Sequence, residues 1–425
     1  MSRRLRFISG AVLAALAALA IAAALAWPRE QFVPAASAEA WAPTSANIAR
    51  GAYLARAGDC MACHTARGGA PYAGGRAMDT PFGTLYTPNI TPDRATGIGK
   101  WSADDFWNAL HNGKGRDGRL LYPAFPYTSY TKVSRADSDA LFAWLRSLPP
   151  RQAQNRAHAL RFPYDSQLAL VGWRLLYFKP GVFEADAKRD AQSNRGAYLV
   201  EGLGHCSACH STRNRFGAAD EALGGGLIPT IGWYAPSLTS DSEAGLGRWK
   251  EEHIVQLLRT GVAPGASVTG PMAEVVAQSL QHMHEADVRA MAVYLKSLPG
   301  GPAPAREPAP RAPQQVLDEG SRLYRQHCAA CHGERGEGLG PYPALAGNRA
   351  LSLAEPVNAI RVVLNGGFAP ATAGNPRPYG MPPFSHVLDD AQVATLVTYL
   401  RASWGNAAAP VSSAQVNRYR AVPLD

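Results

Sequence analysis

The chain has 425 residues, of which 18% are charged, and carries a formal charge of +9 at pH 7. This charge is too small and too scattered to indicate a nucleic-acid partner. The 41 glycines and 33 prolines favour small, loop-rich domains over one large aliphatic core, and the length predicts two to four of them.

The N-terminus has the pattern of an export signal. Three arginines among the first six residues precede an unbroken apolar run from Ala11 to Trp27, and a small-residue cleavage site follows at Ala36–Ala38. We interpret residues 1–38 as a signal peptide. The alternative is an uncleaved N-terminal anchor, because the run and the residues before it are long enough to span a bilayer. In both cases we expect the body of the protein outside the cytoplasm.

One five-residue motif occurs three times, at Cys60–His64, Cys206–His210 and Cys328–His332, and uses all six cysteines. Two thiols one helical turn apart can add to the two vinyl groups of a haem, and the next histidine is then held beneath the iron. A zinc knuckle, a redox dithiol or a disulfide framework explains Cys-x-x-Cys, but none requires a histidine after every pair.

We therefore predict three covalently bound haem c groups. The attachment residues are Cys60, Cys63, Cys206, Cys209, Cys328 and Cys331. The predicted axial ligands that follow them are His64, His210 and His332.

Each motif lies between the same two predicted helices, which indicates an internal repeat. A short glycine-containing helix precedes the motif, and an amphipathic helix with apolar residues at helical spacing closes the unit. We expect a glycine of the first helix to let an aromatic residue of the last helix cross it closely. The glycines are Gly51, Gly196 and Gly320, and the aromatic residues are Trp144, Tyr294 and Tyr399.

The repeat predicts three domains joined by two unlike linkers. The first linker is aromatic-rich and is expected to pack between domains one and two, whereas the second is proline-rich and is expected to be a stiff spacer. The last domain would then sit apart or be held by a partner. The predicted ranges are 45–150, 191–299 and 314–406 for the domains, 151–190 and 300–313 for the linkers, and 407–425 for a tail.

A methionine in the loop before the closing helix commonly supplies the sixth iron ligand and raises the reduction potential. Met272 in Gly270–Met272 and Met381 in Tyr379–Pro383 occupy such loops. We predict both as axial ligands of the second and third haems.

The first unit departs from this pattern, because Phe125 stands where the methionine is expected. Phenylalanine cannot bind iron, so three alternatives remain open. His111 ends the helix before this loop and would make a bis-histidine haem; Met78 lies in the preceding loop; otherwise the iron is five-coordinate.

With the three motifs, the segments Asn89–Asp93, Leu121–Ala124, Gly270–Val276 and Gly380–Phe384 resemble the triple-haem cytochrome c subunits of bacterial membrane-bound, quinone-reducing dehydrogenases. Those enzymes oxidise alcohols, gluconate, sorbitol, fructose or aldehydes. The resemblance covers roughly residues 45–405. Phe125 is its main departure, since alcohol dehydrogenase subunits carry methionine there.

The resemblance implies an all-α fold of three consecutive class I cytochrome c domains, each wrapped around one haem. It also implies a periplasmic location at the outer face of the cytoplasmic membrane. Electrons would pass from a dehydrogenase catalytic subunit to ubiquinone or a terminal oxidase of the respiratory chain. The partner would be a quinoprotein, a flavoprotein or a molybdenum hydroxylase.

Covalent cofactors with both axial positions filled suit outer-sphere electron transfer and not substrate chemistry. The sequence has no credible dinucleotide-binding loop, nucleophile elbow or zinc-protease helix. We therefore expect an electron-transfer subunit that is not an enzyme by itself. The competing hypotheses are a haem enzyme or gas sensor built on an open first haem, and a soluble periplasmic shuttle without a fixed partner.

Overall fold

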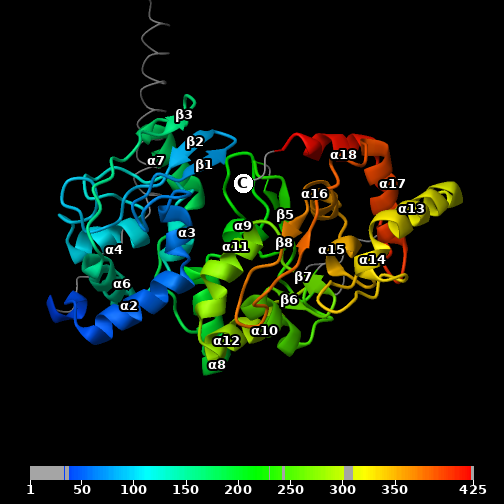
Figure 1. Ribbon diagram of the computed structural model, residues 1–425. Coiled ribbons are helices and arrows are strands. Elements are labelled where there is room, and N and C mark those ends of the chain that lie inside the picture. The colour runs from blue at the N-terminus through cyan, green and yellow to red at the C-terminus, as the bar shows by residue number, and fades with distance from the viewer. Residues whose placement is uncertain (1–32, 34–37, 229, 242–244, 301–309, 423–425) are drawn as a thin grey trace, which may run out of the picture.

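The computed structural model describes residues 33, 38–228, 230–241, 245–300 and 310–422. They form three largely helical units in a row, with the N-terminal unit at one end and the C-terminal unit at the other (Figure 1). Most of the predicted leader and proline-rich linker lie outside the described residues. Within those ranges, no helix has the length and apolar character that crossing a bilayer requires.

The first unit is built on two helices that pack side by side, α2 and α6. Each begins at a side chain that accepts a hydrogen bond from the first turn, Thr44 for α2 and Ser134 for α6. The elements are η1 (Ala38–Trp41), α2 (Ser45–Ala57), α3 (Cys60–His64), β1 (Ala77–Thr80), β2 (Gly83–Tyr86), α4 (Ala103–Asn112), α5 (Tyr127–Tyr130) and α6 (Arg135–Ser147).

The linker after the first unit contains β3 (Ala159–Leu160) and α7 (Gln167–Tyr177). Strand β3 pairs with β2 and completes a three-stranded antiparallel sheet in the order β1-β2-β3. Helix α7 contacts both neighbouring units, since Arg174 donates to the Asn112 carbonyl and the Trp173 indole N–H donates to the Phe216 carbonyl.

The second unit repeats the packing of the first, with α8 lying against α12. The π-helical η2 continues α8 directly, and its backbone leaves helical geometry at Gly202. The elements are α8 (Ala191–Tyr198), η2 (Leu199–Leu203), α9 (Ser207–His210), β4 (Gly226–Ile228), β5 (Trp233–Ala235), α10 (Glu251–Thr260), β6 (Val262–Ala263), β7 (Ala266–Ser267), α11 (Pro271–Gln278), η3 (Leu280–His282) and α12 (Glu285–Ser297).

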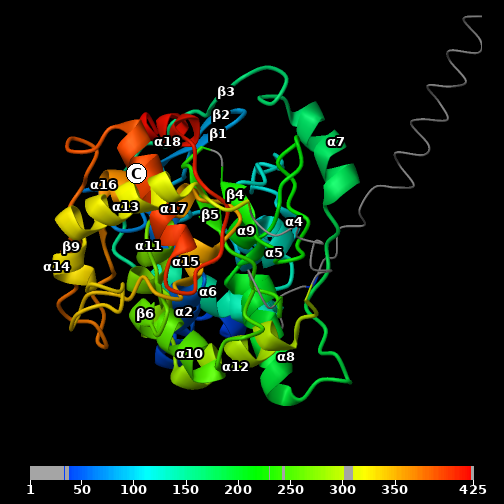
Figure 2. The same ribbon diagram turned by 90° about the vertical axis from the view of Figure 1, so that its right-hand side faces the viewer.

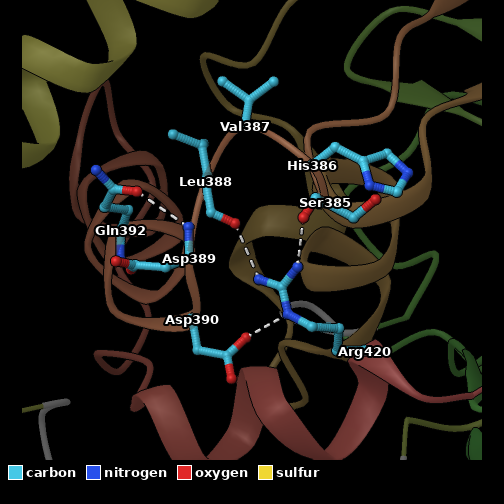
Figure 3. Close-up of a pocket in the computed structure, with 8 residues that line it drawn as sticks. All are labelled: Ser385, His386, Val387, Leu388, Asp389, Asp390, Gln392 and Arg420. Carbon is cyan, nitrogen blue, oxygen red and sulfur yellow. Dashed lines mark hydrogen bonds and ion pairs between the residues drawn. The ribbon is translucent and has the colours of Figure 1, made fainter.

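In the third unit α13 packs against α17, and a C-terminal helix packs against α17 and α16. Figure 3 shows how that helix is held: Arg420 donates to the Ser385 and Leu388 carbonyls and pairs with Asp390. The elements are α13 (Gln314–His327), α14 (Ala329–His332), α15 (Arg349–Ser352), α16 (Val357–Asn365), β8 (Gly367–Phe368), β9 (Gly380–Met381), α17 (Asp390–Ala402) and α18 (Ser413–Arg420).

The described residues are largely helical, as expected, and their loops also form four small antiparallel sheets. One expectation from the sequence needs correction. The third unit does not sit apart, because it is hydrogen-bonded to the second. The Tyr234 N–H donates to the Asn358 amide oxygen at 2.9 Å, and the Asn358 amide nitrogen donates to the Tyr234 carbonyl at 2.8 Å. Neutral polar contacts of this kind leave no periodic pattern in a sequence.

The close helix crossings are confirmed in all three units. A Cβ placed on Gly51 would lie 2.6 Å from the Trp144 Cβ. A Cβ on Gly196 would lie 2.0 Å from the Ala290 carbonyl oxygen and 2.8 Å from the Tyr294 Cβ, and one on Gly320 would lie 2.4 Å from the Tyr399 Cβ. Real atoms do not approach this closely, so only glycine lets the two helix backbones meet.

Replacing Gly196 with alanine should therefore lower the free energy of unfolding by about 1–3 kcal/mol, the usual cost of overpacking a close contact. Gly172→Ala in α7 is the matched control, because an added Cβ there meets nothing within 4 Å. Alanine should stabilise that helix position by about 0.5–1 kcal/mol. Denaturant unfolding measures both variants, and equal stability of the two would contradict the crossing.

Candidate haem sites

The three motif histidines are held in the same way. In each ring Nδ1 lies at hydrogen-bonding distance from the carbonyl oxygen of a proline: 2.8 Å from His64 to Pro88, 2.6 Å from His210 to Pro236, and 2.9 Å from His332 to Pro343. A carbonyl accepts only from a protonated nitrogen, so Nδ1 carries the hydrogen. Nε2 then keeps its lone pair, which is the arrangement an iron ligand needs.

These histidines also lie where the neutral ring is favoured. Burial lowers the pKa of His64 and of His332, and the hydrogen bond to the proline carbonyl opposes this only in part. The pKa of His210 falls to about 4, through burial first and also through the charge of Arg349. The protein therefore presents neutral imidazoles at neutral pH.

The cysteines lie in surroundings that disfavour the thiolate. None of the six forms a disulfide. Burial raises the pKa of Cys60 and Cys206 to about 12 and that of Cys63 and Cys328 to about 11. A redox dithiol needs a lowered thiol pKa, so the surroundings of these four cysteines argue against that alternative.

Each of the three hydrophobic cores joins one attachment cysteine to one residue of the predicted ligand loop. Cys206 and Met272 pack on the core of the second unit, and Cys328 and Met381 belong to that of the third. Cys60 and Phe125 pack on the core of the first. The folded chain thus brings the two ends of each predicted haem site together.

The two methionines differ from the sequence expectation in their backbone setting. Met272 lies in the first turn of α11 and Met381 at the end of the short strand β9, where an irregular loop was expected. Pro271 explains the helix, because proline fits the first helical position and Gly270 precedes it. Their assignment as iron ligands stays a prediction.

In the first unit, Phe125 packs its ring 5.3 Å from that of Tyr130. His111 lies on α4, outside the loop that contains Phe125. Its ring is fully buried and stacks on that of Trp107, with ring centroids 4.5 Å apart. Its Nδ1 is 3.4 Å from the Thr131 hydroxyl, and its buried Nε2 has no hydrogen-bond partner among the described residues.

Other residues of α4, Phe106 and Leu110, join the core that contains Cys60. Met78 lies in β1 opposite Leu85 of β2. The sixth ligand of the first haem therefore remains open among the predicted alternatives.

Known proteins match most of the length of the chain. The cytochrome c family model matches residues 48–149 and 317–404. The gluconate 2-dehydrogenase cytochrome c subunit of Pantoea cypripedii is 41% identical over 384 residues, which are 85% of this chain and 86% of that protein. The chain belongs to the cytochrome c subunits of quinone-linked dehydrogenases.

Two further relatives place this cytochrome subunit among dehydrogenase components. The cytochrome c subunit of quinone alcohol dehydrogenase from Gluconobacter oxydans is 38% identical over 394 residues, 88% of this chain and 82% of that protein. One of the subunits of nicotinate dehydrogenase from Pseudomonas putida is 44% identical over 393 residues; the match covers 90% of this chain but only 32% of that longer protein. The relatives that are named as cytochrome c subunits are electron-transfer subunits and not catalytic ones, and cytochrome c domains imply covalently bound haem c.

The first two haem sites of the cytochrome subunit are joined by an ion pair that no sequence pattern indicated. Arg76 contacts Glu274 twice, at 2.8 and 3.1 Å, and also donates to the Ala62 carbonyl inside the first motif. Glu274 is two positions after Met272, so one arginine links the first attachment helix to the predicted ligand helix of the second site.

Asp59 lies beside this ion pair, directly before Cys60. Its backbone is left-handed, with φ of 49°, and its buried Oδ1 accepts no hydrogen bond from the described residues. Burial, with a further contribution from the charge of Glu274, raises its pKa to about 7. The folded protein therefore favours the protonated carboxyl.

This shift predicts a pH-dependent stability. Between about pH 4 and 7 the folded state holds a proton that the unfolded chain releases, so the free energy of unfolding should fall by about 1.4 kcal/mol per pH unit as the pH rises. Asp59→Asn removes the ionisation and suits a left-handed backbone. The variant should lose this slope and be more stable at pH 7.

Denaturant unfolding at pH 5 and pH 7 measures the difference, with the exposed Asp165 changed to asparagine as the control. If Asp59→Asn keeps the pH slope of the parent protein, the assignment to Asp59 is wrong.

Proposed function

We propose that this chain is a periplasmic triple-haem c-type cytochrome that relays electrons from a partner dehydrogenase to ubiquinone or the respiratory chain. The observation that carries the proposal is one arrangement present three times: a Cys-x-x-Cys-His motif whose histidine Nδ1 is held by a proline carbonyl. The three units, at residues 45–150, 191–299 and 314–406, would each be a class I cytochrome c domain around one haem.

When bound, haem c supplies a reversible one-electron couple. The chain's own residues hold and shield it. The proline carbonyls fix the rings of the motif histidines, which would bind the iron, and Met272 and Met381 would supply further ligands in the second and third sites. An iron held in this way in apolar surroundings would be closed to substrate, which favours electron transfer over catalysis at these sites.

The arrangement of the units supports a relay in chain order. The second unit lies between the other two (Figure 1). Helix α3 packs against α11, which brings the first attachment motif next to the predicted ligand helix of the second site. An electron travelling between the first and third haems would therefore pass through the second.

A dehydrogenase catalytic subunit is the partner that supplies the electrons in this proposal. The cytochrome relatives carry the names of gluconate, alcohol, fructose and nicotinate dehydrogenases, which differ in substrate. A quinoprotein, a flavoprotein or a molybdenum hydroxylase would fit, because the cytochrome needs from its partner only single electrons at a suitable potential.

Mass measurement and purification test the function together. The exported protein, denatured, should carry three covalent haems, and a variant with alanine at Cys206 and Cys209 should carry two. A large dehydrogenase subunit should co-purify from solubilised membranes. Fewer than three haems on the parent chain, or six thiols that are free or bridged to one another, would refute the proposal. A haem-loaded protein that purifies alone would point to the soluble shuttle.

Membrane association is supported by the outer face of α7. Leu168 and Leu176 are 79% and 72% exposed, and Phe162, just before the helix, is 86% exposed. Figure 2 shows α7 at the edge of the molecule. The opposite face is anchored by buried Leu170 and Arg174.

Charge indicates what would cover this face. Arg161 and Lys179 are exposed at the two ends of the segment, and one exposed acidic residue, Asp165, lies between Arg161 and the helix. An apolar helix face flanked by basic side chains fits an anionic lipid surface, into which such a helix lies flat. We therefore assign α7 as the membrane-contacting element of the proposed cytochrome.

Changing Leu168 and Leu176 to aspartate should weaken membrane binding at least tenfold, because burying each leucine contributes about 1.5–3 kcal/mol. Salt washing of membranes that contain the full-length protein gives the released fraction. Val387→Asp is the control, since Val387 is 58% exposed in the third unit. Equal release of the two variants would exclude α7 as the contact.

A further inference from the structure

Asn348 and Arg349, at the start of α15, each contact a residue next to one of the prolines whose carbonyls hold the motif histidines. Asn348 donates its amide nitrogen to the Ala344 carbonyl at 3.0 Å, and Ala344 follows Pro343, the partner of His332. Arg349 reaches into the second unit and donates to the Ser237 carbonyl at 2.6 Å. Ser237 follows Pro236, the partner of His210.

The carbonyl of the residue after the proline thus accepts from a neutral amide in the third site and from a cation in the second. In the third unit the donor is Asn348 of the same unit. The second unit receives the guanidinium of Arg349 from the neighbouring unit. In the first site the corresponding residue, Asn89, is engaged through its backbone N–H by the amide oxygen of Asn155. The partners named for Ala344 and Asn89 are uncharged, so among these three contacts to the residue after the proline, the one to Ser237 is made by a cation.

Arg349 is held firmly in this position. Its backbone N–H donates to the Gly265 carbonyl at 3.1 Å, and its guanidinium carbon lies 5.5 Å from the centroid of the Trp249 ring. Its Nε is removed from solvent. Ser237, which it contacts, is 4% exposed.

The side chain remains a cation despite this burial. Burial lowers the pKa of Arg349 to about 10, and Tyr234 and Asp241 act in the opposite direction. At neutral pH the guanidinium is therefore protonated. Asp241 offsets part of its charge, but the guanidinium donates directly to the Ser237 carbonyl, one residue after the proline that holds His210.

We propose that Arg349 is a positioning residue through which the third unit raises the reduction potential of the second haem. The inference rests on the proposed function, because it requires a haem at Cys206 and Cys209 with His210 as its ligand. Reduction adds one electron, delivered by the dehydrogenase, and removes one positive charge from the iron. A fixed cation in poorly screened surroundings disfavours the form with the higher charge, so it favours the reduced one.

The test is a redox titration of the full-length protein and of two variants. Arg349→Gln removes the charge, and Arg349→Lys keeps it. Arg322→Gln, in the exposed part of α13, is the control for net charge. The couple of the second haem is identified as the one that Met272→His displaces. Haem content by denaturing mass measurement is recorded for every protein.

Arg349→Gln should lower the reduction equilibrium constant of the second haem about tenfold, which is a fall of about 59 mV for a one-electron couple. Arg349→Lys should stay near the parent value, and Arg322→Gln should change none of the three couples. An unchanged second couple in Arg349→Gln, an equal fall in the lysine variant, or an equal fall at all three haems would overturn the inference. A parent protein without haem on the second motif would instead refute the proposed function.

Discussion

The hydrogen bond between each motif histidine and a proline carbonyl is the constraint on which the haem sites depend. It fixes which ring nitrogen carries the proton and leaves the other available to a metal. The proline follows the histidine by 24 residues in the first unit, 26 in the second and 11 in the third. Loops of different length therefore converge on the same local geometry.

That geometry needs a rigid support, which the glycine crossings supply. Because Gly51, Gly196 and Gly320 bring two helix backbones into contact, each unit is held together with a small apolar core. An attachment cysteine belongs to the core of the third unit or packs against the core of the first and second, so the site and the packing of each unit are linked. A substitution at a crossing glycine is therefore expected to alter the packing around the attachment cysteine.

The named contacts between units are made by charged and polar groups, whereas each unit is packed around an apolar core. The first and second units are joined by charged side chains, as at Arg76 and Glu274 and where Tyr53 and Arg195 share Asp287. The second and third are joined by backbone and amide contacts, together with Arg349. Charges placed between cofactor sites act on their potentials, whereas apolar contacts of the same area would only hold them together.

The sequence alone was enough to predict the three motifs, the helix pairs and the crossing partners, because each depends on residues at fixed short spacing. Trp144, Tyr294 and Tyr399 could be named from helical periodicity and a glycine in the partner helix. The contacts with the proline carbonyls were not predicted, because a backbone carbonyl has no side-chain signal in the sequence.

Only the tertiary structure brought Arg349 to the second site and placed His111 beside Trp107. It also decided that the third unit packs against the second, where a proline-rich stretch indicated separation. Contacts between distant segments depend on how whole units lie against one another, and no local pattern of residues encodes them.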